Sequence, residues 1–220
     1  MTNDNFGAAL GDFYGEWNRQ AEVLCDESKP YADRLAALRW IDRAVGETTP
    51  PDKLEEVAAE LRELRELLDL SYDGEFTDED WKHGLGGTHA LLKIDGELVA
   101  AGALVRRRLK HDGRNLRCGY VEGVATHPDH RRQGHAGAVM KTLEALAGTY
   151  DLLALSSSES GFELYESRGW DLWGGHTSVQ SPSGVVATPG DDGSVFVFAA
   201  EVQLDLDGEL TCDWREGDVW

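Results

Sequence analysis

Residues 121–138, VEGVATHPDHRRQGHAGA, combine a strand, a polar loop, a glycine-bearing turn and the start of a helix. Small residues in such a turn let the backbone approach a ligand closely, and unpaired amides at the helix N-terminus point outward. These amides, the helix dipole and two arginine side chains suit an anion such as a diphosphate. The residues that we expect to form this anion site are Arg131, Arg132, Gln133, Gly134, His135, Ala136 and Gly137.

Other chemistries fit the same region less well. A glycine turn often does no more than begin a helix, so that interpretation stays open. Neither the dinucleotide pattern GxGxxG nor the P-loop pattern GxxxxGK[ST] occurs in the sequence. Pro128 separates His127 from His130 and breaks any helix that would align them, so we expect no metal site. The serines at 156–158 lack the GxSxG elbow of hydrolases, which favours polar residues at a strand end.

Three helical segments are expected before residue 70. Apolar residues recur at intervals of three and four in Phe6–Leu24, Tyr31–Val45 and Lys53–Leu70. Pro50 and Pro51 mark the start of the third segment. Its leucine stripe lies opposite a glutamate-rich face, which is typical of a helix that packs against its own domain. A helix that binds a partner is the alternative interpretation of this stripe.

Strands are expected from about residue 88 onward. His89–Ile94 and Leu98–Arg106 flank the hairpin turn Asp95-Gly96, and the turn Asp112-Gly113 leads into Leu116–Thr126. These three segments predict an antiparallel meander. The remaining expected elements are a helix at Gly134–Ala147, a strand at Asp151–Leu155, a helix at Glu159–Arg168 and late strands at Thr177–Gln180, Gly184–Ala187 and Ser194–Leu206. Helices and strands mix without a regular βαβ repeat, so the predicted class is α+β.

The size and composition of the chain set further limits. A chain of 220 residues and 24.2 kDa fits one large domain, or one medium domain with an appendage. Its hydrophobic fraction of 41% suffices for a core and excludes disorder of the whole chain. No segment approaches the roughly 18 apolar residues of a membrane span, and the start lacks a signal-peptide layout, so we expect a cytoplasmic protein. Cys25, Cys118 and Cys212 are widely spaced and are expected to be reduced thiols.

The chain is strongly acidic, with 41 acidic and 21 basic residues and a net charge of −20. This charge repels phosphate backbones and anionic membranes, so we expect neither a nucleic acid nor a membrane as a partner. The acids are spread along the chain, as in proteins solvated at high salt, where screening removes the self-repulsion. A salt-loving source is therefore favoured. An ordinary acidic cytosolic protein and a protein with a cationic substrate are the alternatives.

The sequence resembles a known family of enzymes. Arg131-x-x-Gly134-x-Ala136 after a strand resembles the loop [QR]xxGx[GA] that binds the acyl-coenzyme A diphosphate in the GNAT acyltransferase superfamily. Blocks across about residues 73–220 resemble the aminoglycoside 2'-N-acetyltransferase family of the bacterial resistance type. These blocks are FTDEDWKHGLGGTHALL, LRCGYVEGVA, ALSSS, LYESRGW, TPGDDGSVFV and CDWREGDVW.

The resemblance implies a fold and a reaction. The fold would be α+β, with a GNAT-type mixed, mainly antiparallel central sheet flanked by helices. Residues 53–220 would form this domain, and residues 1–52 a helical N-terminal extension of unknown role. The reaction would transfer acetyl from acetyl-CoA to the 2'-amino group of a cationic aminoglycoside, by direct attack in a ternary complex. Enzymes of this type often pair through late strands, which is compatible with a homodimer.

Roles follow from the resemblance for the reacting groups. Glu122 would take the proton of the amine through a water, and Gly123 beside it suits a backbone irregularity that exposes Glu122 in a cleft. Tyr165 would protonate the departing coenzyme A thiolate. The amide of Val124 would face the thioester carbonyl, and the backbone of Val124, Ala125 and Thr126 would pair with the pantetheine arm. Without the resemblance, Glu122 could be an ordinary strand carboxylate and Tyr165 a core aromatic.

The resemblance also implies a polycation site made of carboxylates and dipolar oxygens. The implied contacts are Glu75, Asp80, Glu122, Gly123, Ser156, Asp191, Asp218 and the terminal carboxylate of Trp220. Three departures stand out. Glu75 replaces an aspartate of the family, Gly190 replaces the first of three acids, and the family's first strand is missing or disguised near Leu38–Val45. Another polyamine or amino sugar as substrate, and a non-catalytic aminoglycoside binder, are therefore the alternatives.

Overall fold

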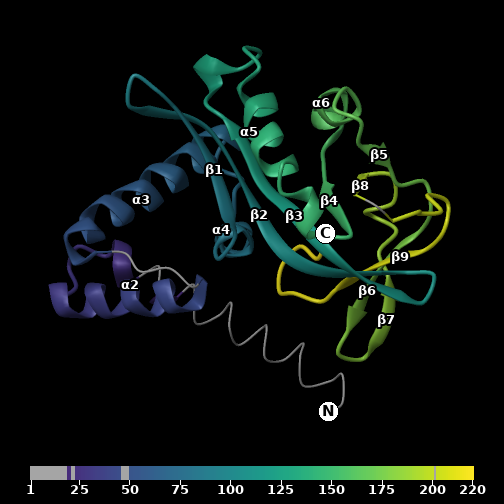
Figure 1. The fold of residues 1–220 in the computed structure, drawn as a ribbon, viewed down its shortest axis with the longest axis horizontal. Coiled ribbons are helices and arrows are strands. Elements are labelled where there is room, and N and C mark those ends of the chain that lie inside the picture. Colours follow the sequence, from purple (N-terminus) through teal and green to yellow (C-terminus); the bar gives the residue numbers. More distant parts are fainter. Residues whose placement is uncertain (1–18, 21–22, 46–49, 201) are drawn as a thin grey trace.

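A computed structural model describes residues 19–20, 23–45, 50–200 and 202–220. Most of the expected helix Phe6–Leu24 lies outside these residues. The molecule is elongated (Figure 1), with α2 (Tyr31–Val45), α3 (Leu54–Ser71) and α4 (Asp78–Gly84) toward one end and the late strands at the other. A 3-10 turn at Pro51–Lys53 directly precedes α3.

The predicted helix Tyr31–Val45 is confirmed as α2. Of the two alternatives for the family's first strand, missing or disguised near Leu38–Val45, the disguised strand is therefore wrong. Arg34, Ala37 and Leu38 recur at helical spacing, and all three are buried. The guanidinium of Arg34 donates to both carboxylate oxygens of Glu55 at 2.8 and 3.0 Å, and to the carbonyl of Leu24 at 2.8 Å. Packing of α2 against α3 therefore accounts for the burial of Arg34, Ala37 and Leu38.

In the described part of the chain, nine strands form one sheet in the order β5-β8-β4-β3-β2-β9-β6-β7, with β1 also paired to β2. Only the β3–β4 and β6–β9 pairs are parallel, so the sheet is mixed and mainly antiparallel as predicted. The strands are β1 (Thr88–Ile94), β2 (Glu97–His111), β3 (Arg114–Thr126), β4 (Leu152–Ser156), β5 (Asp171–Leu172), β6 (Thr177–Ser181), β7 (Gly184–Ala187), β8 (Val195–Ala199) and β9 (Leu210–Asp213).

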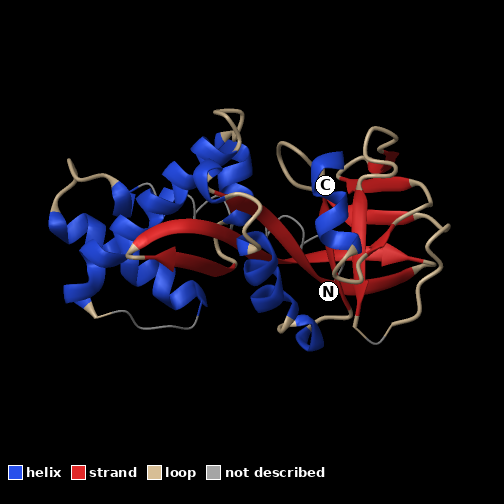
Figure 2. Cartoon of the chain, turned by 90° about the horizontal axis from the view of Figure 1, so that it is seen from above, coloured by secondary structure: helices blue, strands red, loops and turns tan. Residues whose placement is uncertain are grey.

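Two layers of helices cover the sheet around its long central hairpin. On one face, α5 (His135–Glu144) packs Val139, Met140 and Leu143 against β2 and β3. On the other face, α3 packs Leu64 and Leu67 against the same strands. The short helix α6 (Phe162–Glu166) follows β4, and 3-10 turns lie at Pro128–His130, Ala147–Thr149 and Glu159–Gly161. Figure 2 shows most of the helices gathered around one half of the long strands, with α6 and the late strands beyond them.

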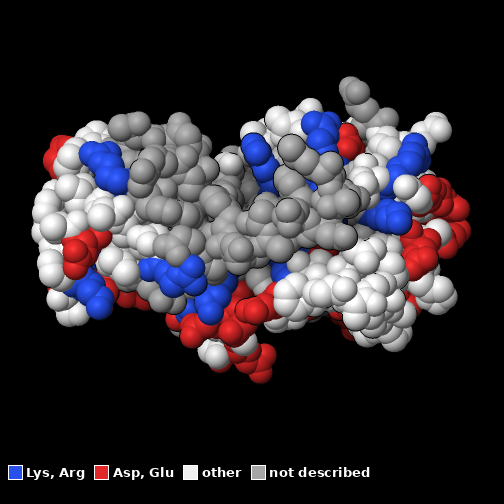
Figure 3. Space-filling view, turned by 90° about the horizontal axis from the view of Figure 1, so that it is seen from below, with Lys and Arg blue, Asp and Glu red and all other residues white. Residues whose placement is uncertain are grey.

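Several boundaries differ from the predictions. The expected helix Glu159–Arg168 is a 3-10 turn followed by the five residues of α6, and the expected strand Ser194–Leu206 ends at Ala199. Strand β2 continues past Arg106 to His111, because its alternate residues there are buried between β3 and β9. Acidic side chains lie at both ends of the face in Figure 3 and along one edge between them, in keeping with acids spread along the chain.

Candidate active site

A β-bulge lies at the centre of the sheet. Ala101 pairs with Ala125 but Ala103 pairs with Glu122, so β3 has one residue more than β2 at this point. Gly123 adopts a φ of 56°, in the left-handed region that favours glycine. The bulge therefore supplies the backbone irregularity that we predicted beside Glu122.

A cleft opens at the bulge, between the sheet and helices α3 and α4. It brings together three of the predicted substrate residues, Asp80, Glu122 and Gly123. Its other lining residues are Leu64, Leu68, Phe76, Trp81, Gly84, His89, Gly102 and Ala103. Burial lowers the pKa of His89, which favours a neutral imidazole in the cleft.

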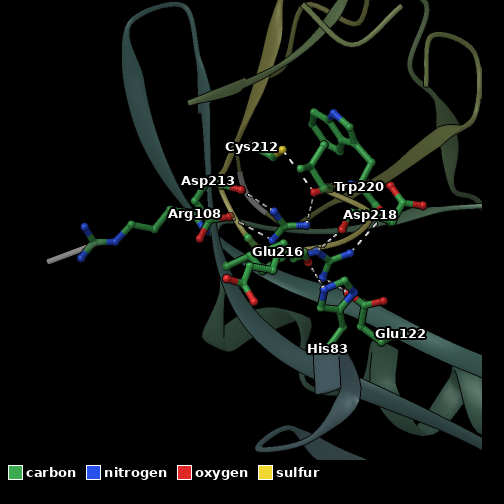
Figure 4. Close-up of polar contacts among 11 residues, drawn as sticks. His83, Arg108, Glu122, Cys212, Asp213, Glu216, Asp218 and Trp220 are labelled. Atoms are coloured by element: carbon green, nitrogen blue, oxygen red, sulfur yellow. Dashed lines mark hydrogen bonds and ion pairs between the residues drawn. The ribbon is translucent and has the colours of Figure 1, made fainter. Parts of the chain in front are cut away.

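Glu122 forms an ion pair with Arg215 in the C-terminal segment. Its side chain is 14% exposed and that of Arg215 is 15% exposed. The same guanidinium donates to the main-chain oxygens of Asp218, at 2.6 Å, and Trp220, at 3.1 Å (Figure 4, where Glu122, Asp218 and Trp220 are labelled). The predicted catalytic carboxylate is thus joined directly to the last residues of the chain.

The C-terminal segment, residues 213–220, is docked rather than frayed. Trp220 is 3% exposed, and its indole N–H donates to the hydroxyl of Thr188 at 2.9 Å. His83 of α4 hydrogen-bonds the carbonyl of Glu216 at 2.7 Å. Arg107 of β2 donates to the carbonyl of Val219 at 2.8 Å. The segment therefore forms a wall beside Glu122.

Predicted acidic residues lie in the cleft, at Asp80, and in or near the C-terminal segment, at Asp191 and Asp218. Partial burial raises the pKa of Asp191, and the nearby charge of Asp218 raises it further. Asp80 accepts hydrogen bonds from the backbone N–H and hydroxyl of Thr77, at 2.9 and 2.8 Å, and so caps α4 while lining the cleft. A protonated amine would meet several negative groups here.

Five predicted substrate residues lie outside the lining of this cleft, namely Glu75, Ser156, Asp191, Asp218 and Trp220. Glu75 is exposed in the turn before α4. Ser156 lies at the end of β4, where its hydroxyl is 3.1 Å from that of Ser194. Gly190 has no heavy atom within 4 Å of the position where a Cβ would stand, so this departure from the family pattern leaves open space next to Asp191.

The backbone beyond the bulge is available to a ligand that pairs like a strand. β3 and β4 pair from Cys118 and Leu152 as far as Tyr120 and Ala154, although both strands continue beyond this point. Figure 1 shows them separating there. The β3 backbone at the predicted pantetheine positions, which are Val124, Ala125 and Thr126, therefore has no pairing partner in β4.

The predicted anion loop has the expected backbone geometry. Arg132 and Gly134 have φ values of 60° and 84°, and Gly134 caps α5 without any side-chain hydrogen bond to the first-turn amides. These amides are therefore available to an anion. The Arg131 side chain does not point to the anion as predicted. Its guanidinium donates instead to the carbonyl of Ser71, at the end of α3, at 2.7 Å.

Tyr165 projects from α6 into the core beside the opening between β3 and β4. It is buried, and its ring centroid lies 5.6 Å from Phe196 and 6.0 Å from Trp170. Burial raises its pKa well above the ordinary range, and nearby Tyr72 raises it further. The phenol therefore keeps its proton at neutral pH and can offer it in a hydrogen bond.

Two functional candidates escaped the sequence analysis. Tyr72 ends α3, and its hydroxyl donates to the carbonyl of Val124 at 3.2 Å. Its pKa is raised to about 12 by burial and by the charges of Glu122 and Asp80. Arg215 is the other, and it lay within the block CDWREGDVW that had already been singled out. The Tyr72 contact joins residues far apart in sequence, so no local pattern marks it.

Comparison with known proteins agrees with this geometry. A model of the acetyltransferase (GNAT) domain matches residues 55–173. The fold and the site define an N-acetyltransferase, and the chain belongs to the GNAT acetyltransferase family. Within it, the chain is 48% identical over 161 residues to the aminoglycoside 2'-N-acetyltransferase of Mycolicibacterium fortuitum, covering 71% of this chain and 83% of that protein.

Solved structures also resemble the chain at low sequence identity. The GNAT family N-acetyltransferase YhbS from Escherichia coli, in complex with CoA, is 17% identical with a TM-score of 0.49, covering 71% of this chain and 84% of that one. A GNAT family acetyltransferase from Brucella melitensis, in complex with acetyl-CoA, is 12% identical with a TM-score of 0.48, covering 69% and 88%.

Proposed function

We propose that this protein transfers an acetyl group from acetyl-CoA to the 2'-amino group of aminoglycosides by direct attack in a ternary complex. The observation that carries the proposal is the bulge that places Glu122 in the cleft, where Asp80 also lies. Beyond the bulge, the backbone of Val124 has no pairing partner in β4. The 48% identity to an aminoglycoside 2'-N-acetyltransferase supports the choice of acceptor.

The reaction needs a neutral amine, a polarised thioester carbonyl and stabilisation of the leaving thiolate. Glu122 accepts the proton of the amine through a water. The nitrogen attacks the thioester carbon, and the N–H of Val124 stabilises the negative charge that develops on the carbonyl oxygen. The C–S bond then breaks as the amide forms. Tyr165 gives its proton to the thiolate, and the second proton that the nitrogen loses restores the phenol, so the products are the amide, the free thiol and the proton held by Glu122. The diphosphate of acetyl-CoA lies on the amides at the start of α5.

The acceptor side suits a polycation. Asp80, Asp191, Asp218 and the terminal carboxylate of Trp220 would contact its ammonium and hydroxyl groups. Glu75, which is exposed before α4, and Ser156, at the end of β4, would contact more distant parts of the drug. The open space at Gly190 favours a second candidate, in which the same chemistry acts on another polyamine or amino sugar.

Thiol release from acetyl-CoA tests the proposal, with untagged protein in low and in molar KCl. We expect turnover with tobramycin and kanamycin B, which carry a 2'-amine, and none with kanamycin A, which carries a 2'-hydroxyl. Equal turnover with kanamycin A would refute the 2' position. If acetyl-CoA binds but no aminoglycoside is acetylated, the acceptor is another amine. Absence of acetyl-CoA binding would favour a non-catalytic binder.

Removing the Tyr72 hydroxyl should strengthen cofactor binding. This hydroxyl occupies the Val124 carbonyl, with which the pantetheine arm would pair. A net hydrogen bond is worth about 0.5–1.5 kcal/mol, so Tyr72→Phe should bind acetyl-CoA about two- to tenfold more tightly in calorimetry. Tyr150→Phe is the matched control, because the Tyr150 ring lies against Gly119 of β3. Unchanged or weaker binding by Tyr72→Phe would show that the hydroxyl does not compete with the cofactor.

None of the described helices is long and apolar enough to cross a membrane. A cytoplasmic location, a homodimer and a salt-loving source stay predictions, and the two salt concentrations of the assay above address the last of them. Among the described residues, no cluster of three or more histidine, cysteine or acidic side chains has metal-binding geometry.

A further inference from the structure

Arg215 has one guanidinium and three partners. It forms an ion pair with Glu122 of β3 and donates to two main-chain oxygens, those of Asp218 and Trp220. A guanidinium is planar, so three acceptors that it binds at once are held in a fixed relation to each other. The position of the C-terminal segment and the orientation of the Glu122 carboxylate are therefore set by the same group.

A second arginine holds the C-terminal segment independently of Glu122. Arg107 donates to the carboxylate of Asp213 at 2.9 Å, to its carbonyl at 2.6 Å and to the carbonyl of Val219 at 2.8 Å. The two guanidiniums lie over the same ring, that of Tyr120, at 4.8 Å for Arg107 and 5.5 Å for Arg215. Arg107 thus binds the segment to β2, whereas Arg215 connects it to the predicted base.

We propose that Arg215 is a positioning residue, which couples docking of the C-terminal segment to the orientation of Glu122. The inference rests on the proposed function, in which Glu122 takes the proton of the acceptor and residues 218–220 contact the acceptor. Arg215 binds Oε1 of Glu122, and the described contacts leave Oε2 for the water that accepts the proton. An acceptor that contacts the segment thereby acts on the carboxylate that deprotonates it.

The coupling is reciprocal, so it can be measured without any aminoglycoside. The readout is release of Trp220 by a carboxypeptidase from the full-length ligand-free chain, because Trp220 is buried. Hydrogen bonds to charged groups are worth about 1.5–3 kcal/mol, so Arg215→Gln and Glu122→Gln should each speed release about tenfold or more. Arg117→Gln is the control, since Arg117 lies near the start of β3, the strand that carries Glu122, and pairs with Asp151. Circular dichroism verifies that each variant is folded.

Steady-state kinetics with an amine that the wild-type protein acetylates provide the second readout. We expect Arg215→Gln to lower kcat about tenfold or more, with the KM for acetyl-CoA unchanged. Arg215→Lys keeps the charge but cannot bind three acceptors in one plane, so its kcat should lie between those of Arg215→Gln and wild type. A wild-type kcat in Arg215→Lys would show that charge alone matters and would overturn the coupling.

The two readouts separate this inference from the proposed function. If Glu122→Gln leaves the release of Trp220 as slow as in wild type, the ion pair does not hold the segment and the inference is wrong. If wild type acetylates no aminoglycoside while both variants speed the release, the proposed function fails and the coupling stands.

Discussion

Replacing Glu122 by glutamine is expected to lower kcat for amine acetylation by about 10²–10⁴-fold, the usual contribution of a general base. Glutamine has nearly the same shape but cannot accept the proton. The Kd of acetyl-CoA should stay unchanged, because its predicted contacts are the backbone around Val124 and the loop before α5. Steady-state kinetics give kcat and calorimetry gives Kd.

Glu97→Gln is the matched control for this variant. Glu97 is an exposed carboxylate at the start of β2, the neighbouring strand, and lies outside the cleft. Its loss should leave kcat within about twofold of wild type, since an exposed carboxylate away from the cleft contacts neither substrate. If Glu122→Gln behaves like Glu97→Gln, Glu122 is an ordinary strand carboxylate and another group, or the solvent, takes the proton.

The central hairpin was predictable because its turns have a local cause. In both Asp-Gly turns the aspartate and the glycine have positive φ, 52° and 90° at Asp95 and Gly96, as a two-residue hairpin turn requires. The β1–β3 meander is confirmed with these turns in place. The loop before α5 was predictable for the same reason, since its glycine turn is a local signal.

The short strands β5 and β9 and the C-terminal segment after β9 were not predictable from local sequence. β5 and β9 have only two and four residues, too few to show a period, and they form because neighbouring strands pair with them. The ion pair of Glu122 joins residues 93 positions apart. Helix α4 was also missed, although Thr77 and Asp80 form a capping box at its start.

The N-terminal extension is the element for which sequence and family resemblance gave the least guidance. In the structure Ala37 and Leu38 of α2 share a buried cluster with Leu54 and Ala58 of α3, and Trp81 of α4 packs against it. Leu24, before α2, and Leu85, directly after α4, complete the cluster. The other end of α3 lines the cleft through Leu64 and Leu68. The extension therefore supports α3 and α4, the two helices that line the cleft.

Leu38→Ala should accordingly destabilise the whole protein. Leu38 is 1% exposed, and removing a buried leucine side chain typically lowers the free energy of unfolding by about 2–5 kcal/mol. Because the cluster spans α2, α3 and α4, the loss should shift one cooperative transition, seen in urea by both far-ultraviolet circular dichroism and tryptophan fluorescence. Leu70→Ala is the control, since Leu70 is 48% exposed on α3 and its loss should cost under about 1 kcal/mol.

The alternative is that residues 1–52 form an appendage that folds on its own. In that case Leu38→Ala would produce a separate early transition and leave the unfolding of residues 53–220 unchanged. Acetylation kinetics would then match those of wild type below the main transition. A single shifted transition would instead make the extension part of the core that holds α3 and α4 beside Glu122. In that case acceptor binding should also weaken at urea concentrations just below the transition.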